Sequence, residues 1–523
     1  MKDFFKRHFG LAHHTGFVLV LSLFIILGFF VLAMVAIAIM AAGTDIYVQE
    51  LNSAQAFYLA EAARNFTLEY YLSWGTRFTD TTRFPNFTRT FPVGSFNVNY
   101  ANRTQRACDI TFDGSITGLT PPITRRIFQH FASNINDYFS GALLSRGNFG
   151  NCLSPNVQSE LTINGNIYFL DNPRFGWDIC SRGGASGALD CRVCQGNIPP
   201  DTCPVCSGWA ACTSGCTGSG PGPTITGNVF VDGDAKVYST SLTGNITASG
   251  TISTQPVLCA NSGSISNCTP PICNPNTPVT IPAKPAIDQT YYDFEINRAL
   301  NNPDYGTHTW EEYLLSDIPA VLKAEGRSLY VMGALVINEN IINGPKNIVA
   351  GGGYIGTTNG VRVGERIALI SNGAISAINP GVRVGGTWNG TNMVGAGALL
   401  YARNSTDDDT SMNVSGISTN WARVKGALVT PTSGTQKFRS INVSGSSWLE
   451  GVIYGKTINN WFGTVRGSVA IDGPIWCPGG CTYANSLYGI LRSANITYDN
   501  SLIPLSIKGL YSCSGGDWQE LNQ

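Results

Sequence analysis

The sequence predicts an α+β protein, in which one long N-terminal helix is followed by a large, mainly β head. An apolar run without charged side chains, from Phe17 to Ala42, continues directly into an amphipathic helix pattern. The rest of the 523-residue chain holds most of the 59 glycines, and only 13% of all residues are charged, as is typical of turn-rich β proteins. From residue 161 onward, short β-like phrases recur.

The apolar run is long enough to cross a membrane. As a helix with a rise of about 1.5 Å per residue, it would be about 39 Å long. Lys2, Lys6 and Arg7 precede the run and Asp45 is the first charged residue after it, so we expect the N-terminus in the cytoplasm and the head outside. The alternative is a simple signal anchor, which would hold the chain in the membrane without processing.

The helix is expected to cover residues 17–74 and to end near Trp74. Beyond the apolar run, apolar side chains recur in steps of three and four residues, at Leu51, Tyr58, Leu59, Ala62 and Phe66. A helix that is apolar first and amphipathic later suits packing into a helical bundle and then against a globular head.

The start of the chain resembles the class III leader of type IV pilins. Gly16 and Phe17 stand between a polar, mostly basic leader, residues 1–16, and the apolar run. A prepilin peptidase would cut there and leave Phe17 as the new terminus, open to N-methylation. The segment from Ala56 to Ala62, AFYLAEA, is similar to the start of PilX-type minor pilins, and the resemblance ends near Tyr70.

One departure from the pilin pattern bears on the place of the subunit in a filament. Major pilins carry a glutamate as the fifth residue after the cut, where this chain has Leu21. A buried carboxylate is tolerated only with a partner, so this subunit cannot make the corresponding contact. The resemblance therefore implies a minor subunit at or near a filament tip. Its filament-packing residues would be Leu21, Leu51, Tyr58, Leu59, Ala62 and Phe66.

The same resemblance implies partners and a location. The chain would be a single-pass inner-membrane protein cut by the prepilin peptidase, and would then join other pilin subunits in an extracellular filament or at the cell surface. Its head would contact a surface polysaccharide or a host or abiotic surface. The balance of 33 basic and 34 acidic residues argues against nucleic acid as the main partner. A K-type pseudopilin of type II secretion is a further alternative.

Changes in composition and residue pattern along the sequence divide the head into three regions. Residues 75–160 are expected to form a pilin-like β region, in which Phe91 to Tyr100 alternates like a strand and Ile127 to Leu144 fits a helix or a strand. Residues 161–285 are expected to be β with a Cys-rich insertion. Residues 286–523 are expected to form a β-rich head that begins with a partly helical cap or bridge.

Repeated phrases indicate a β-solenoid. Thr162 to Tyr168 and Thr224 to Phe230 are near copies, TINGNIY and TITGNVF, and Leu242 to Thr247 repeats the Gly-Asn corner. Short strands joined at such corners, with apolar residues stacked inward, are typical of solenoids. The irregular spacing of the phrases leaves a β-sandwich with long loops as the alternative.

Cysteines supply the first candidate metal site. Fifteen cysteines indicate an oxidising compartment. The pairs Cys191-x-x-Cys194 and Cys203-x-x-Cys206 could hold zinc tetrahedrally. Disulfides are favoured over zinc, because thiolates outside the cell compete with oxidation.

Carboxylates supply the second candidate metal site. Asp407 and Asp409 could offer oxygen ligands to calcium. The run lacks a glycine-turned loop and a later glutamate, so a solvated acidic turn is favoured. We therefore expect no cofactor, with calcium and zinc as the alternatives.

The sequence contains no nucleophile elbow, phosphate loop or other catalytic constellation, so we expect no enzyme. The expected function is that of a minor pilin-like subunit whose head serves adhesion or assembly priming. The rival function is that of a membrane-anchored β-solenoid protein that binds or cleaves polysaccharide. In that case Trp388, Trp421, Trp448, Trp461 and Trp476 could line a sugar-binding surface, and core packing would explain these tryptophans equally well.

Overall fold

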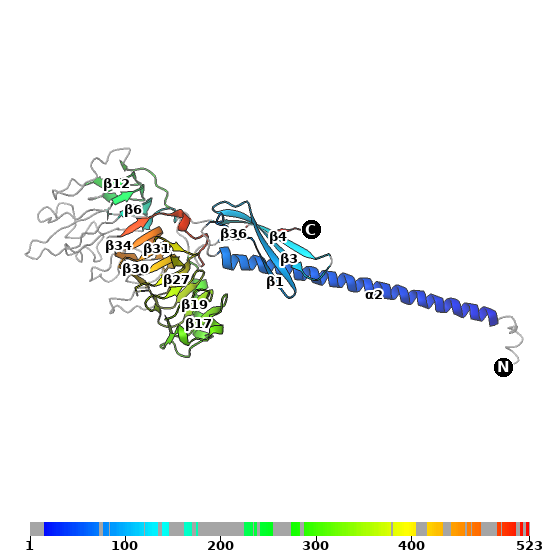
Figure 1. Cartoon of the computed structure of the whole chain (residues 1–523). Helices are drawn as coiled ribbons and strands as arrows, with labels where there is room; N and C mark the ends of the chain where they lie inside the picture. Colours follow the sequence, from blue (N-terminus) through cyan, green and yellow to red (C-terminus); the bar gives the residue numbers. More distant parts are fainter. Residues whose placement is uncertain are drawn as a thin grey trace, which may run out of the picture.

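The structure is a computed structural model in which a long helix projects from a β head (Figure 1). An antiparallel sheet packs along the second half of the helix, a stack of short strands lies beyond it, and the C-terminus lies beside the antiparallel sheet (Figure 1). The structure describes residues 15–72, 77–82, 84–119, 121–133, 139–145, 162–169, 174–175, 224–233, 235–237, 241–254, 273–282, 287–377, 380–403, 416–431, 441–455, 458–461, 463–471, 489–492, 494–508, 513–515 and 519–521.

The long N-terminal helix is confirmed. Helix α2 (Thr15–Phe66) continues into a short π-helix, η1 (Thr67–Leu72). Every side chain from Leu21 to Leu51 is exposed. Among the described residues, α2 is the one helix that is long and apolar enough to cross a membrane.

The antiparallel sheet has the order β1-β2-β3-β4. Its strands are β1 (Phe87–Phe91), β2 (Gly94–Ala101), β3 (Ala107–Ile116) and β4 (Thr124–Ser133). Every second residue of β3 is buried, as expected for a sheet with one face against a helix. Strand β2 lies in the segment predicted to be extended, and the described part of the segment 127–144 includes the second half of strand β4.

The last strands of the chain return to this antiparallel sheet. Strands β36 (Cys513–Gly515) and β37 (Gln519–Leu521) both pair with β4. Residues 286–523 are predicted to form one head, but these two strands lie in the sheet that packs on α2. The stacked strands between β4 and β36 are therefore an insertion into the antiparallel domain.

The inserted part is a β-solenoid, as predicted, because its three stacked sheets consist of parallel pairs throughout the described residues. The largest sheet contains β5 (Leu143–Ser145), β6 (Thr162–Asn164), β7 (Ile167–Phe169), β9 (Thr224–Thr226), β10 (Val229–Val231), β12 (Ser241–Thr243), β13 (Ile246–Ala248), β15 (Cys273–Asn274), β17 (Ser328–Val331), β19 (Asn347–Ala350), β21 (Arg362–Val363), β22 (Ala368–Ser371), β24 (Arg383–Val384), β27 (Ala398–Ala402), β29 (Arg423–Val429), β31 (Trp448–Gly455), β33 (Thr464–Ile471) and β35 (Asn495–Thr497).

The second and third sheets line the other sides of the solenoid. The second contains β16 (Glu312–Leu314), β18 (Ala334–Ile337), β20 (Tyr354–Thr357), β23 (Ala374–Ala377), β28 (Ile417–Asn420), β30 (Ile441–Ser444), β32 (Ile458–Trp461) and β34 (Gly489–Arg492). The third contains β8 (Arg174–Phe175), β11 (Ala235–Val237) and β14 (Ile252–Thr254). A hairpin, β25 (Thr387–Trp388) and β26 (Met393–Val394), and three 3₁₀ turns, η4 (Leu315–Asp317), η5 (Ala320–Lys323) and η6 (Asn500–Leu502), complete it.

The repeated phrases stack on one another in register. Ile163 pairs with Ile225 across β6 and β9, and Ile225 pairs with Leu242 on β12. At the corner, Gly227 has a φ of +146°, and a Cβ there would lie 2.3 Å from the main-chain oxygen of Gly165. Only glycine combines this backbone conformation with such a close approach, so the repeated Gly-Asn corner sets the rung spacing.

The order of the rungs does not follow the order of the sequence. The chain enters the solenoid at β5, near the middle, and stacks outward to β15 at one end. It then resumes at β17, at the other end, and stacks back toward the middle. There β33 pairs with both β31 and β5, and β35 pairs with β6. Two halves, contributed by successive stretches of the chain, therefore meet inside one sheet.

The largest sheet is buried on both faces. On β17, Leu329 and Val331 face the interior of the solenoid, while Tyr330 faces an outer cluster covered by α3 (Gln289–Asn301). From α3, Tyr292 stacks on Tyr401 with a centroid distance of 3.5 Å. The partly helical cap predicted after residue 286 is thus present. Burial on both faces explains the nearly continuous apolar strands.

Candidate functional site

The apolar half of α2 is the first candidate site. Gly16 and Phe17 lie in the first turn of this helix, and cleavage between them stays a prediction. Leu21 is 49% exposed and Leu51 is 46% exposed, so neither packs onto the rest of the chain. This half of the helix contacts nothing else in the described structure and offers its whole circumference to a membrane or to other helices.

The C-terminal part of α2 has one buried face and one exposed face. Ala56, Ala60, Ala63 and Thr67 are completely buried against the antiparallel sheet. Of the predicted filament-packing residues, Leu59 and Phe66 are half-buried beside that face, while Tyr58 and Ala62 are exposed with Leu51. The predicted stripe therefore includes both a part that carries the head and a part that faces outward.

Small residues set the position of the buried face. A Cβ on Gly114 of β3 would lie 2.0 Å from the main-chain oxygen of Ala56 and 2.6 Å from the nitrogen of Ala60. The helix thus approaches the sheet at its narrowest side chains. The spacing of Ala56, Ala60 and Ala63 is visible in the sequence, but the sequence does not show that Gly114 lies opposite.

Two polar contacts lock the rotation of the helix on β4. Arg64 Nε donates to Gln129 Oε1 at 2.8 Å, and Arg125 Nε donates to Ser53 Oγ at 2.7 Å. Gln129 is buried, so its amide needs this partner. We call α2 from residue 52, η1 and strands β1–β4 the neck.

A short segment fastens the solenoid to the neck, and we call residues 503–508 the strap. Ile503 and Ile507 lie in the outer cluster of the solenoid beside α3, whereas Leu505 lies in the core of the neck. All three side chains are buried. Ser133 Oγ donates to the main-chain oxygen of Leu505 at 2.7 Å. The strap therefore packs both into the outer cluster of the solenoid and into the core of the neck.

Further contacts join η1 to the solenoid. Glu69 pairs with Lys346 at 3.1 Å, and the guanidinium of Arg366 lies 5.2 Å from the ring centroid of Tyr71. Burial, with Lys346 nearby, lowers the pKa of Lys508 at the end of the strap. The exposed ion pair adds little by itself, and the strap supplies most of the attachment.

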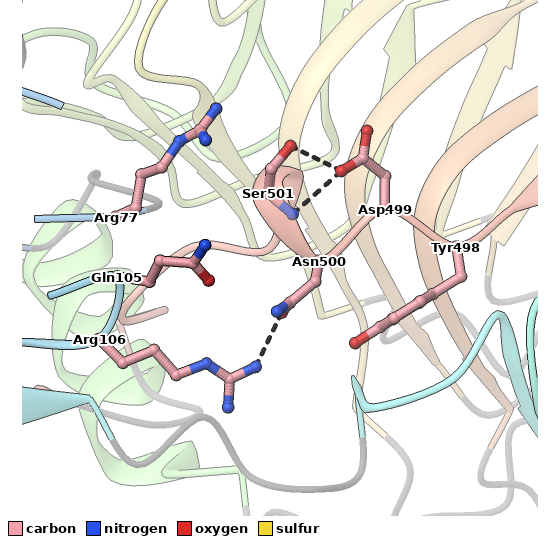
Figure 2. A pocket seen from close by; sticks show the side chains of 7 residues that line it. All are labelled: Arg77, Gln105, Arg106, Tyr498, Asp499, Asn500 and Ser501. Atoms are coloured by element: carbon pink, nitrogen blue, oxygen red, sulfur yellow. Dashed lines mark hydrogen bonds between the residues drawn. The ribbon is translucent and has the colours of Figure 1, made fainter. Parts of the chain in front are cut away.

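A cavity of about 370 Å³ lies where the neck meets the solenoid (Figure 2). We call it the neck pocket. Its lining residues are Arg77, Gln105, Arg106, Tyr498, Asp499, Asn500 and Ser501. In Figure 2 the three neck side chains face the four solenoid residues, and Arg106 Nη2 donates to Asn500 Oδ1 at 2.8 Å. No local sequence pattern indicates this pocket, because its two sides lie nearly 400 positions apart in the chain.

A buried ion pair on the solenoid has a structural role. Lys425 and Glu450 lie side by side on neighbouring rungs, with 3.6 Å between Nζ and Oε2, and both are buried. Lys425 Nζ donates to the main-chain oxygen of Met393, and the Met393 nitrogen donates to Glu450 Oε1. The ion pair thus holds the β25–β26 hairpin down.

Tryptophans gather near the same hairpin. Trp388 and Trp448 meet edge-to-face at 5.4 Å, and Arg423 lies over the ring of Trp388 at 4.7 Å. Trp421 is 55% exposed and has a φ of +56°, which is rare for a bulky residue. These are three of the five tryptophans for which the sequence predicts either a sugar-binding surface or core packing; of the other two, Trp476 lies outside the described residues.

The predicted metal ligands lie outside the described residues. This holds for Cys191, Cys194, Cys203 and Cys206 and for Asp407 and Asp409. In the described ranges, no group of three or more His, Cys, Asp or Glu side chains could hold a metal ion. Cys273 on β15 is disulfide-bonded. The choice between disulfides and zinc for the four cysteines stays a prediction.

Comparisons with known proteins give little to set beside this geometry. No protein-family model matches the chain, and no curated protein matches it. One similar solved structure is the crystal structure of the competence-associated pilin ComZ from Thermus thermophilus, with 13% sequence identity. The match covers 90% of this chain and 98% of that one, with a TM-score of 0.19. At that score the two chains do not superpose as one fold.

Proposed function

We propose that the chain is a pilin-like subunit of a type IV filament, which assembles through α2 and carries the solenoid as an extracellular head. The observation behind the proposal is the division of α2. The helix is apolar to Ala42 and exposed on all sides from Leu21 to Leu51, and one face becomes buried at Ala56, where the helix meets the antiparallel sheet. So large an exposed apolar surface needs a membrane first and neighbouring helices afterwards.

The proposal includes a minor position in the filament. Leu21 stands where major pilins have their glutamate, so the subunit would cap or interrupt the regular contacts. The solenoid is held to the neck by the strap and would project from the filament for adhesion or for priming assembly. The mechanism is assembly without catalysis, and it requires no cofactor.

The decisive experiment is N-terminal mass analysis of the protein recovered from sheared surface filaments. The proposal expects a mature chain that begins at Phe17 and is N-methylated. Gly16→Leu should block cleavage, whereas the matched variant Gly28→Leu, whose Cβ would meet nothing within 4 Å, should be cleaved normally. A chain that still begins at Met1 and stays in the membrane would overturn the proposal.

The rival function is a membrane-anchored solenoid that binds polysaccharide, and the exposed Trp421 and the Trp388–Trp448 pair favour it. The same mass experiment separates the two, because the rival requires no cut at Gly16. A type II secretion pseudopilin would be cut at Gly16 but retained in the cell envelope rather than recovered in sheared filaments.

A further inference from the structure

The neck pocket combines two positive side chains with an already neutralised acid. Asp499 Oδ1 accepts hydrogen bonds from the nitrogen and the hydroxyl of Ser501, at 3.0 Å and 2.6 Å. Asp499 Oδ2 accepts from Arg466 Nη2 at 2.9 Å, and Arg466 lies outside the pocket lining. The negative charge of Asp499 is therefore neutralised by Arg466, which lies outside the cavity lining. The charge that faces the cavity comes from Arg77 and Arg106.

The two guanidinium groups keep most of their donors available. In the described part of the chain, the side chain of Arg106 makes one hydrogen bond, to Asn500, and that of Arg77 makes none. The bond to Asn500 holds Arg106 against the solenoid wall of the pocket (Figure 2). An arginine fixed in this way is prepared for two-pronged contact with a carboxylate or phosphate.

The remaining lining suits a polar body attached to such an anion. Gln105, Asn500 and Ser501 supply amide and hydroxyl groups. Burial raises the pKa of Tyr498, so its hydroxyl stays protonated and can donate at neutral pH. A volume of about 370 Å³ is at the small end of ligand pockets, and a single sugar ring would fit it better than a long chain.

We propose that the neck pocket binds a small organic anion, in which one carboxylate or phosphate group is attached to a polar body about the size of one sugar ring. Arg106, held at the solenoid wall by Asn500, binds the anionic group, Arg77 on the other side of Gln105 adds positive charge to the pocket, and Gln105 with the Tyr498–Ser501 corner holds the polar body. Because both walls are needed, the ligand contacts the neck and the solenoid together. This inference does not depend on whether the chain enters a filament.

The test measures binding to the full chain in detergent by calorimetry. The probes are glucuronate, glucose 6-phosphate and inorganic phosphate, with glucose as the neutral control. The proposal expects glucuronate or glucose 6-phosphate to bind and glucose not to bind. Polygalacturonate distinguishes the sources of the anion, because a site for chain ends binds the polymer in proportion to its ends, whereas a site for free metabolites binds only the small acids.

Variants decide whether the binding belongs to this pocket. Arg77→Gln should weaken binding of the acidic probe by about tenfold or more, because it removes one of the two positive charges that line the pocket. Arg77 is exposed and lies at the surface, so this variant should fold normally. The control Arg362→Gln removes an exposed arginine elsewhere and should leave binding unchanged. Arg106→Lys keeps the positive charge but loses the paired N–H donors of the guanidinium group, and should weaken binding of carboxylates.

Three results would overturn the inference. The first is an absence of binding by any acidic probe to the wild-type chain. The second is equal binding by wild type and Arg77→Gln. The third is an equal loss in Arg77→Gln and Arg362→Gln, which would show that the probe senses only net charge.

Discussion

The hydroxyl of Ser506 donates a 2.8 Å hydrogen bond to the main-chain oxygen of Leu72, joining residues 434 positions apart. Leu72 ends the helical part of the neck, and Ser506 lies on the strap that follows the last described solenoid rung. One contact thus links the helix to the far end of the inserted head. A force on the solenoid would pass through this point and through Leu505 beside it.

We predict that a larger side chain destabilises the neck on the buried alanine face of α2 but not on its exposed face. Ala60→Leu inserts a larger side chain between helix and sheet and should lower the free energy of unfolding of the neck by about 1–3 kcal/mol. Ala62→Leu adds the same atoms on the exposed face and should leave that stability unchanged. Thermal unfolding followed by tryptophan fluorescence and circular dichroism compares them. Equal losses would show that the buried face is assigned wrongly.

We predict that Leu505 is the residue of the strap whose truncation costs the most stability. Leu505→Ala leaves a cavity in the core of the neck and should cost about 2–5 kcal/mol. We expect limited proteolysis to separate the neck from the solenoid sooner in this variant. Leu502→Ala, in a half-buried position just before the strap, serves as the control. Equal cleavage rates would show that the strap does not hold the head.

We predict that replacing glycine with alanine costs more stability at a stacked corner of the solenoid than at a glycine that has a positive φ but open space around it. Gly326 has a φ of +79° but open space around its Cβ position, so Gly326→Ala should cost about 1–3 kcal/mol through backbone strain alone. Gly227→Ala adds a collision with the neighbouring rung and should destabilise the solenoid more. The midpoints of urea unfolding measure both. A smaller loss for Gly227→Ala would contradict the stacking of the rungs.

The β2–β3 hairpin predicts a loss of stability in acid. Asn102 donates to Asp109 Oδ2 at 2.6 Å and His130 lies 2.7 Å from Oδ1, and these contacts, Asn102 first, lower the pKa of Asp109. Its pKa in the unfolded chain is about 3.9, so the contribution is present above about pH 4 and is lost as the pH falls through the folded value. Asp109→Asn removes the contribution at every pH.

Urea unfolding at about pH 6 and about pH 3 checks this expectation, because the two conditions lie on either side of the unfolded pKa. The wild-type chain should lose more stability than Asp109→Asn between the two conditions. A parallel decline in the two proteins would mean that Asp109 does not contribute.

Much of this architecture is visible in local patterns. The helix follows from an apolar run that continues as three- and four-residue steps, and the rungs follow from phrases such as Thr162 to Tyr168 with their glycine corners. The filament-packing stripe was only partly resolved, because the buried side of α2 is chosen by Gly114, which lies on another strand. The predicted metal ligands lie outside the described residues, so they stay predictions.

The sequence by itself determined the elements: a long helix that is apolar at first, short strands, and glycine corners between them. These features depend on side-chain periodicity and backbone freedom within a few residues. The tertiary structure alone decided that β33 closes against β5, that β36 returns to β4, and that Arg106 meets Asn500. Such pairings join distant parts of the chain, and each is selected by the burial and hydrogen bonding of the whole fold rather than by any local pattern.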